Sequence, residues 1–479
     1  MPVGAKESRE NMMPPIPAPE IEPTRALARF AAELAFDDLP APVVATLKRR
    51  VLDSLGAALA ATTLGDGCAE TMAVMAGLGG RPESTILGLG TKVAAPNAAF
   101  ANGALVHALN YDPIGTEIGH LGVVCLAAPL AVAEAVGGIS GAEFLVASAV
   151  ACETTARLTA AIARTGRRPS GKYVSGQLLN YFGAAVGAGR VLGLDAAGMH
   201  SALGLALMQM AGSRQIVLAG DPPAKAIYGA FPNQAGVLAA LLSKQGLVAD
   251  CDVFGPPAGL YAMIYDGDGD MSVLTEGLGT EFLLGEVGFK PWPTSDRLHP
   301  FIEAAGEIGS GLDSSKIAEV AILAHSDLRP WCEPLEVRRH PENAAAAANS
   351  IPFCVAKALV GGDVTLADFS PQGLNDAAVS AIAGRTSCRL DDGVSGAVVE
   401  VRMGDGRRLE AHVETPLGHP SRPVSHERLV EKFRDCCGHG AQRLTADHVE
   451  RLIALIDDLD RLDDIARLVA LAGGGAESS

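Results

Sequence analysis

The sequence predicts a mainly α-helical protein, in which a large all-helical domain built from both chain ends carries an inserted, smaller α+β domain. Apolar residues recur at helical spacing through the first 285 residues, alternating and β-branched runs appear between 288 and 418, and helical spacing returns after 425. A chain of 479 residues is also too long for one core. We therefore place the helical domain at 23–287 and 419–472, and the inserted domain at 288–418.

The helices of the first part follow from the spacing of their apolar residues. In 42–62 these residues recur every four positions and form one buried stripe: Val43, Leu47, Val51, Leu55 and Leu59. Pro40 and Pro42 separate this helix from another at 25–38. Asp195 is a good N-cap for the helix after it. Further helices are predicted at 66–78, 97–109, 122–136, 141–163, 177–193, 196–211, 226–246 and 271–278.

The inserted domain mixes strands and helices. Strands are predicted at 317–325, 396–403 and 407–415, and Gly404-Asp405-Gly406 between the last two is a strong hairpin signal. Helices are predicted at 296–311, 341–359 and 374–384. After this domain, helical periodicity returns at 425–437 and 444–472, so the chain is expected to re-enter the helical domain.

The composition excludes several classes of partner. Hydrophobic residues make up 48% and charged residues 19%, and the formal net charge is -17. Binding to nucleic acid needs clustered Lys and Arg, so this acidic balance argues against it. It leaves room for an anionic substrate, because a few cations in a cleft can bind a carboxylate. Aromatic residues are only 4% while Gly and Ala abound, which predicts tightly packed helices.

The cysteines and the chain termini suggest a cytoplasmic location. None of the nine cysteines forms a C-x-x-C pair, and most lie in apolar segments, so we expect buried, reduced thiols. Residues 1–22 have no apolar core and are interpreted as a disordered leader rather than a signal peptide, and 473–479 as a frayed tail. The apolar run at 123–136 contains Glu134 and is short for a membrane span.

Residues 107–120, HALNYDPIGTEIGH, form the first candidate segment for chemistry. Polar side chains are dense here, between two apolar helices, as in many active-site loops. They include His107, Asn110, Asp112 and His120. The alternative is a helix cap with ordinary turn residues. A metal site from His107 and His120 is not favoured, because their separation matches no standard ligand spacing.

Two later segments supply cations. In 220–247, Lys225 comes just before an Ala-rich helix, and Tyr228 lies on the next turn. At such a helix start the ammonium group of a lysine can bind a carboxylate. The alternative is an ordinary solvated lysine. In 288–305, prolines fix the backbone after Lys290, and Arg297 and His299 follow within nine residues.

The N-cap of the helix in 288–305 is predicted from Thr294, Ser295 or Asp296. A rigid linker is the alternative interpretation of this segment. No Walker A, HExxH or GxSxG motif occurs, and the glycines within 77–90 lack the context of a dinucleotide site.

Together and in this order, these segments resemble the MmgE/PrpD family, which includes 2-methylcitrate dehydratase, cis-aconitate decarboxylase and iminodisuccinate epimerase. The likeness runs from about residue 23 to about residue 471. Its strongest marks are LKRRVLDSLGAALA, ANGALVHALNYD, GAAVGAGRVLGLD, AKAIYGAFPNQAGVLAALLSKQGL, FKPWPTSDRLH and PLGHPSRPVSHERLVEKF. The resemblance implies a helical domain with an inserted lid, a homodimer, a site at the domain interface, and neither a metal nor an organic cofactor.

The resemblance also assigns site residues. His120, Lys225 and Lys290 match the family's histidine and two lysines, and Asp112 matches the second acidic position of its loop. Other family positions differ: the first loop Asp is Asn110, the third is Pro113, and the Thr is Ile114. A family His falls near Val174, and a family Tyr falls on Phe353.

The expected activity is a lyase reaction on a small carboxylic acid through an enolate. His120 would be the base, Asp112 would orient it or take a proton, and Lys225 and Lys290 would hold carboxylate and enolate charge. Additional substrate contacts are assigned to Asn110, Lys172, Tyr173, Arg297 and His299. The alternatives are an epimerase of an amino or imino dicarboxylate, and a carboxylate-binding protein without catalysis.

Overall fold

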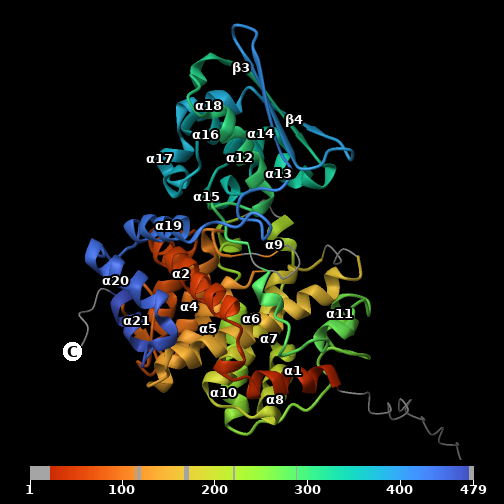
Figure 1. The fold of residues 1–479 in the computed structure, drawn as a ribbon, viewed down its shortest axis with the longest axis vertical. Helices are drawn as coiled ribbons and strands as arrows, with labels where there is room; N and C mark the ends of the chain where they lie inside the picture. Colours follow the sequence, from red (N-terminus) through yellow and green to blue (C-terminus); the bar gives the residue numbers. More distant parts are fainter. Residues whose placement is uncertain are drawn as a thin grey trace, which may run out of the picture.

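The computed structural model describes residues 22–113, 115, 120–166, 172–218, 222–286 and 288–473. Two bodies are visible, a large helical one and a smaller one that carries a sheet (Figure 1). The hydrophobic core is divided in the same way, with one main cluster in the large body and a second that runs from Trp292 to Val413. Apart from Glu22 and Gly473, the expected leader and tail lie outside the described residues.

The large body begins with eleven α-helices. They are α1 (Glu22–Glu33), α2 (Ala41–Leu64), α3 (Cys68–Leu78), α4 (Ala95–Ala108), α5 (Gly122–Val136), α6 (Gly141–Ala163), α7 (Ser175–Val191), α8 (Ala196–Gln209), α9 (Gln215–Leu218), α10 (Ala230–Lys244) and α11 (Leu260–Ile264). The strands β1 (Ser84–Thr85) and β2 (Lys92–Val93) form a small antiparallel pair. As predicted, the Asp195 carboxylate accepts from Gly198 N at 2.8 Å and caps α8.

The end of the chain completes the large body. The helices α19 (His426–Gly438), α20 (Ala446–Asp457) and α21 (Ala466–Ala472) lie beside α2, blue next to red in Figure 1. A Cβ on Gly56 of α2 would lie 3.0 Å from Phe433 of α19, so the two helices are in close contact. The prediction of a mainly α fold, with a body built from both chain ends, is therefore confirmed, but the body is not all-helical as predicted, because it also contains the short pair β1 and β2.

Small residues bring the central helices together. A Cβ on Gly236 of α10 would lie 2.5 Å from Ala184 of α7, and one on Gly103 of α4 would lie 2.7 Å from Gly229 O. These contacts confirm the tight packing predicted from the composition. The helix α6 is long and apolar enough to cross a membrane, but 94% of its apolar window is buried inside the protein. It is therefore a core helix of this body.

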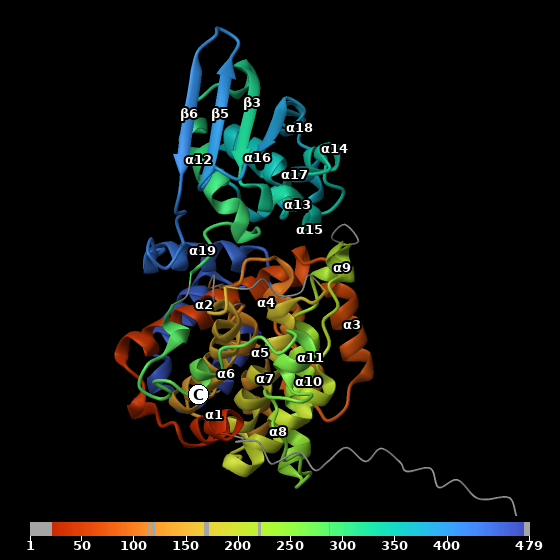
Figure 2. The ribbon, with the colours of Figure 1, turned by 90° about the vertical axis from the view of Figure 1, so that its right-hand side faces the viewer.

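The smaller body contains a four-stranded sheet with the strand order β4-β3-β5-β6. Its strands are β3 (Ile317–Ala324), β4 (Thr386–Leu390), β5 (Ala397–Met403) and β6 (Arg408–Val413). β3 pairs parallel with β4 and antiparallel with β5, and β5 and β6 form the predicted hairpin. Residues along β5 are alternately buried and half-buried, so one face of the sheet packs on helices (Figure 2). The helices of this body are α12 (His299–Gly309), α13 (Arg329–Cys332), α14 (Leu335–Arg339), α15 (Ala344–Ala347), α16 (Ile351–Gly361), α17 (Pro371–Leu374) and α18 (Ala377–Ala383), of which α12, α14, α16 and α18 contact the sheet.

Several predicted elements differ from the structure. The single helix expected at 341–359 is two helices, α15 and α16, because Ser350 accepts a hydrogen bond from Phe353 N and Pro352 opens a new first turn. The helix expected at 444–472 is interrupted after Asp457, and that at 271–278 is only the 3₁₀ turn Met271–Leu274. Strand β4 was not predicted, because its five residues are defined by pairing with β3 rather than by an apolar pattern.

Candidate active site

A cavity of about 310 Å³ lies between the two bodies, and both contribute to its wall. This volume suits a small organic molecule. The large body contributes Leu64, Asp66, His107, Ala108, Leu109, Asn110, His120, Tyr173, Val174, Arg214, Val217, Lys225, Ala226 and Tyr228. The smaller body contributes Pro293, Ser295, Asp296, Trp331, Ala344, Ala345, Ala348, Asn349, Leu366 and Phe369. Four of the predicted site residues are therefore in one cavity: Asn110, His120, Tyr173 and Lys225.

The turn after α4 brings a buried carboxylate between two imidazoles. α4 ends at Ala108, and Asn110 adopts a left-handed conformation with φ of 51°, which Asn tolerates better than most residues. The chain reverses there. Asp112 Oδ1 then lies 3.1 Å from His107 Nδ1, and Asp112 Oδ2 lies 3.1 Å from His120 Nδ1.

This carboxylate is ionised and fixes both rings. Burial alone would raise the pKa of Asp112, but the two imidazoles and their hydrogen bonds outweigh it and hold that pKa well below its usual value. Because an ionised carboxylate only accepts, each ring donates its Nδ1–H to it and keeps an Nε2 lone pair. The His120 side chain is 17% exposed and the His107 side chain 5%, so His120 is the more accessible base. Burial also lowers the pKa of His107.

Lys290 reaches the same loop from behind the cavity wall. Its Nζ donates to Asn110 O at 2.8 Å and to Asn110 Oδ1 at 2.7 Å. The residue is 1% exposed, and burial lowers the pKa of its ammonium. Lys290 thus holds the strained Asn110 turn in place. Two of its three N–H groups are occupied by that residue.

A second buried lysine, which sequence reasoning missed, supports the loop from α19. Lys432 Nζ pairs with Asp53 Oδ1 at 2.6 Å and donates to Tyr111 O at 2.8 Å and Lys290 O at 3.0 Å. It also lies 3.5 Å from the centroid of the Tyr111 ring. The available signal was Asp53, a lone acid in the apolar stripe of α2, because a buried charge needs a partner.

The cavity has two cations on its large-body wall. Lys225 ends the 3₁₀ turn Pro223–Lys225, and Arg214 precedes α9. Arg214 was missed because nothing in its surroundings marks it as special. Tyr228 completes this wall, with its ring centroid 4.3 Å from that of His107, and burial raises its pKa.

The two predicted contacts at 172 and 173 have different surroundings. Tyr173 forms an isolated bridge with Ser213, and Arg214 N donates to Lys172 O at 2.8 Å, so the two segments lie side by side. Tyr173 lines the cavity, whereas Lys172 is exposed and is not among its lining residues.

Arg297 and His299 line a different cavity of about 430 Å³ in the smaller body, together with Lys290 and Asp296. The structure therefore does not bring them together with His120 and Lys225. His299 is buried, and burial followed by the charge of Lys290 lowers its pKa to about 3. Asp296 lines both cavities; burial would raise its pKa, but Arg297 and Lys290 hold it lower.

The predicted N-cap in this segment is wrong. Thr294 Oγ1 donates to Ser295 O, the turn Asp296–Leu298 has no side-chain cap, and α12 begins at His299.

Three of the positions that differ from the family pattern, Pro113, Val174 and Phe353, carry apolar side chains. Val174 lines the cavity at the start of α7. Phe353 is 2% exposed in α16, with its ring centroid 6.4 Å from that of Phe369. Pro113 is buried, and Ile114 lies outside the described residues.

The histidine pair also has the donor set of a metal site. One ligand atom each from His107, Asp112 and His120 lie within 4.8 Å of one another. Two imidazoles and a carboxylate are ligands that Zn²⁺ accepts. An ion there would replace the two hydrogen bonds between the imidazoles and Asp112. The hydrogen-bonded His107–Asp112–His120 arrangement and a metal site are therefore alternatives.

Comparison with known proteins relates this geometry to a family. Residues 25–271 match the MmgE/PrpD N-terminal domain, and residues 292–461 match the MmgE/PrpD C-terminal domain. The cis-aconitate decarboxylase-like protein oryM of Aspergillus oryzae is 26% identical, over 95% of this chain and 98% of that protein. The cis-aconitate decarboxylases of Aspergillus terreus and Homo sapiens are each 25% identical; the matches cover 94% of this chain, and 95% and 94% of those enzymes. The chain belongs to the MmgE/PrpD family.

Proposed function

We propose that this protein is a lyase that eliminates or decarboxylates a small carboxylic acid through an enolate. The observation that carries the proposal is the shared cavity: His120, oriented by buried Asp112, opens on the same space as Lys225. The names of the relatives, which are cis-aconitate decarboxylases, support the same class of reaction.

In an elimination, His120 Nε2 takes the α-proton of the substrate, and the electrons of that C–H bond form an enolate on the neighbouring carboxylate. Lys225 and Arg214 then stabilise the enolate charge. The bond from the β-carbon to the hydroxyl oxygen breaks, and the hydroxyl takes the proton that His120 has gained and leaves as water. In a decarboxylation, the C–C bond to the carboxylate breaks, CO₂ leaves, and the resulting carbanion takes a proton from His120, which has to enter this reaction as the imidazolium.

Asp112 is the positioning residue of this mechanism. It accepts the Nδ1–H of His120 and so leaves the Nε2 lone pair for the substrate. When His120 gains the proton, the same carboxylate stabilises the imidazolium. A positioned base of this kind supplies about 10²–10⁴-fold in rate.

The test is turnover of a panel of small hydroxy, amino and unsaturated acids in heavy water, followed by NMR. An unsaturated product or released CO₂ from the wild-type protein, lost in His120→Gln, supports the proposal. His340→Gln is the matched control, because His340 is exposed and does not line the cavity.

Other outcomes separate the alternatives. Deuterium at Cα without an unsaturated product identifies an epimerase and overturns the lyase assignment. Binding of acids without any turnover identifies a carboxylate-binding protein.

The setting of the enzyme is part of the proposal. We expect a cytoplasmic homodimer that works without metal or organic cofactor. All nine cysteines are free thiols, in keeping with a reducing compartment. Light scattering of the purified chain tests the dimer.

A further inference from the structure

The two walls of the cavity differ in charge. The large-body wall carries Lys225, Arg214, the two imidazoles and one acid, Asp66, whose carboxylate accepts a hydrogen bond from Ala345 N. Beyond Asp296, the described lining residues of the smaller body are Pro293, Ser295, Trp331, Ala344, Ala345, Ala348, Asn349, Leu366 and Phe369, and none is charged. A substrate that fills this space therefore meets cations on one side and hydrocarbon on the other.

The alanines of this uncharged wall are fixed against the large body. α15 is four alanines, capped by Asn343, whose Oδ1 accepts from Ala346 N at 2.8 Å. Ala345 N donates across the junction to Asp66 Oδ2 at 3.1 Å. The helix is thus held close to the cavity with side chains too small to fill it.

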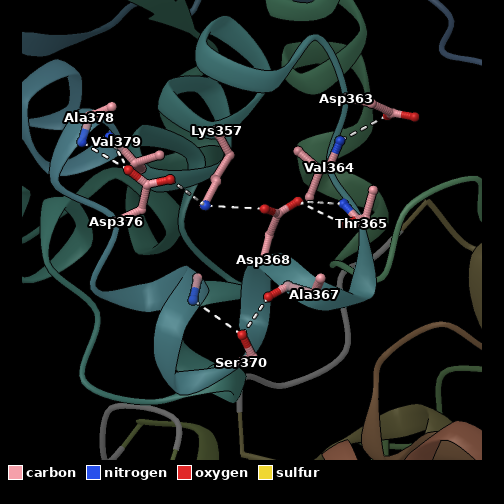
Figure 3. A network of polar contacts seen from close by, with 11 residues as sticks. Lys357, Asp363, Val364, Thr365, Ala367, Asp368, Ser370, Asp376, Ala378 and Val379 are labelled. Carbon is pink, nitrogen blue, oxygen red and sulfur yellow. Dashed lines mark hydrogen bonds and ion pairs between the residues drawn. The ribbon is translucent and has the colours of Figure 1, made fainter. Parts of the chain in front are cut away.

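Leu366 and Phe369 line the cavity. The polar residues beside them, Thr365 and Asp368, bind each other and Lys357 (Figure 3). The Asp368 carboxylate pairs with Lys357 Nζ at 3.1 Å and accepts from Thr365 N at 2.7 Å. Phe369 is backed by the ring of Phe353, where the family pattern has a tyrosine.

Two cations beside Leu366, Phe369 and Asn349 are already engaged. Lys357 is 5% exposed and lies between Asp368 and Asp376, at 3.1 and 3.5 Å. Arg338 donates to Asn349 O at 3.1 Å. A carboxylate placed against Leu366 or Phe369 would therefore lose water without gaining a counterion there.

We infer that the substrate is a short acid whose carboxylates face Lys225 and Arg214 and which carries an uncharged hydrocarbon substituent against Trp331, Leu366 and Phe369. The inference rests on the proposed function, because it takes this cavity as the substrate site. It names an alkyl-substituted dicarboxylate rather than a tricarboxylate.

The test is calorimetric binding of malate, 2-isopropylmalate and citrate to the full chain. The three acids share a hydroxydicarboxylate core and differ in one substituent: hydrogen, isopropyl or carboxymethyl. Burying the isopropyl group predicts that 2-isopropylmalate binds about tenfold or more tighter than malate. Citrate is expected to bind no tighter than malate. Citrate binding tighter than 2-isopropylmalate would overturn the inference.

A variant changes the wall directly. Leu366→Arg adds a cation to it, and we expect citrate to gain at least about tenfold relative to 2-isopropylmalate. Val337→Arg is the control, because Val337 is 55% exposed on α14 and outside the cavity, and it should leave the order unchanged. If Leu366→Arg does not fold, the order in which the wild-type protein binds the three acids still tests the inference.

Affinity and turnover test the two proposals separately: affinity tests the substrate class, and turnover tests the lyase reaction. The predicted order of affinities without turnover counts against the lyase proposal alone. Turnover of acids with the reverse order counts against the substrate class alone. No binding of any of the three acids at millimolar concentration refutes both.

Discussion

Replacing Asp112 by Asn isolates the role of the buried carboxylate. The change keeps the size of the side chain and removes its charge. The amide can still accept from one imidazole, but its NH₂ must donate to the other. That second ring then carries its proton on Nε2 and loses the lone pair that a base needs.

The magnitude follows from the distances. Asp112 Oδ2 lies 3.1 Å from His120 Nδ1, so the charges of the carboxylate and the imidazolium are close to 4 Å apart. At an effective dielectric constant of 20, two unit charges at that separation attract by about 4 kcal/mol. Losing this from the transition state corresponds to about a 10³-fold fall in kcat, within the range of ~10²–10⁴ for a positioned base.

The assay is kcat for the turned-over acid, with thermal unfolding measured in parallel. Asp53→Asn is the contrasting variant, because Asp53 is equally buried near the loop but pairs with Lys432 and does not contact either imidazole. We expect it to lower stability far more than kcat. Retention of more than a tenth of the wild-type kcat by Asp112→Asn would refute the positioning role.

Three further predictions follow from the same region. Lys432→Met should lower the free energy of unfolding, measured in urea, by about 3–5 kcal/mol, because it leaves Asp53 buried without a partner. Arg434→Met on the same helix is the control. It removes only an exposed ion pair and should change the free energy of unfolding by less than about 1 kcal/mol. The pKa of His299 is lowered in the folded state, so on acidification the unfolded chain binds the proton first. The free energy of unfolding should therefore fall by about 1.4 kcal/mol per pH unit from pH 6.5 towards 3. If His299→Gln shows the same dependence of stability on pH, His299 is not its cause. Dialysis against a chelator should leave kcat unchanged, and loss of activity restored by Zn²⁺ would instead assign the His107–Asp112–His120 cluster to a metal.

Much of the fold could be predicted because its signals are local. The stripe of α2, the cap of α8 and the hairpin of β5 and β6 each depend on residues that are close in sequence. The break between α15 and α16 could not be predicted from local residues alone, because Ser350 and Pro352 allow a new helix to start but do not require one. Strand β4 depends wholly on its partner β3, which is more than sixty residues away.

The site was predictable in its residue types but not in its contacts. The dense polar segment contains His120 and Asp112, which the structure brings into contact, and the structure places His107 as the second imidazole on the same carboxylate. Arg297 and His299 lie within nine residues of Lys290 in sequence, yet they line another cavity. Closeness along the chain does not determine on which side of a rigid segment each side chain lies.

The cations of this region form two sets, one that supports the loop at Asn110 and one that lines the cavity. A sequence motif does not show to which set a given lysine belongs. Lys290 and Lys432 are buried: Lys290 donates to Asn110, and Lys432 donates to Tyr111 O and to Lys290 O. Lys225 and Arg214 line the cavity itself. Lys290 was expected to hold substrate charge, but two of its N–H groups fix the Asn110 turn, and only its remaining one is left for a ligand. We therefore propose that Lys290 acts indirectly, by holding the turn that places Asp112 between the imidazoles. Lys290→Met should therefore change the geometry of His120, seen as a shifted pH profile of kcat, whereas Lys225→Met should raise KM for the acid and leave that profile in place.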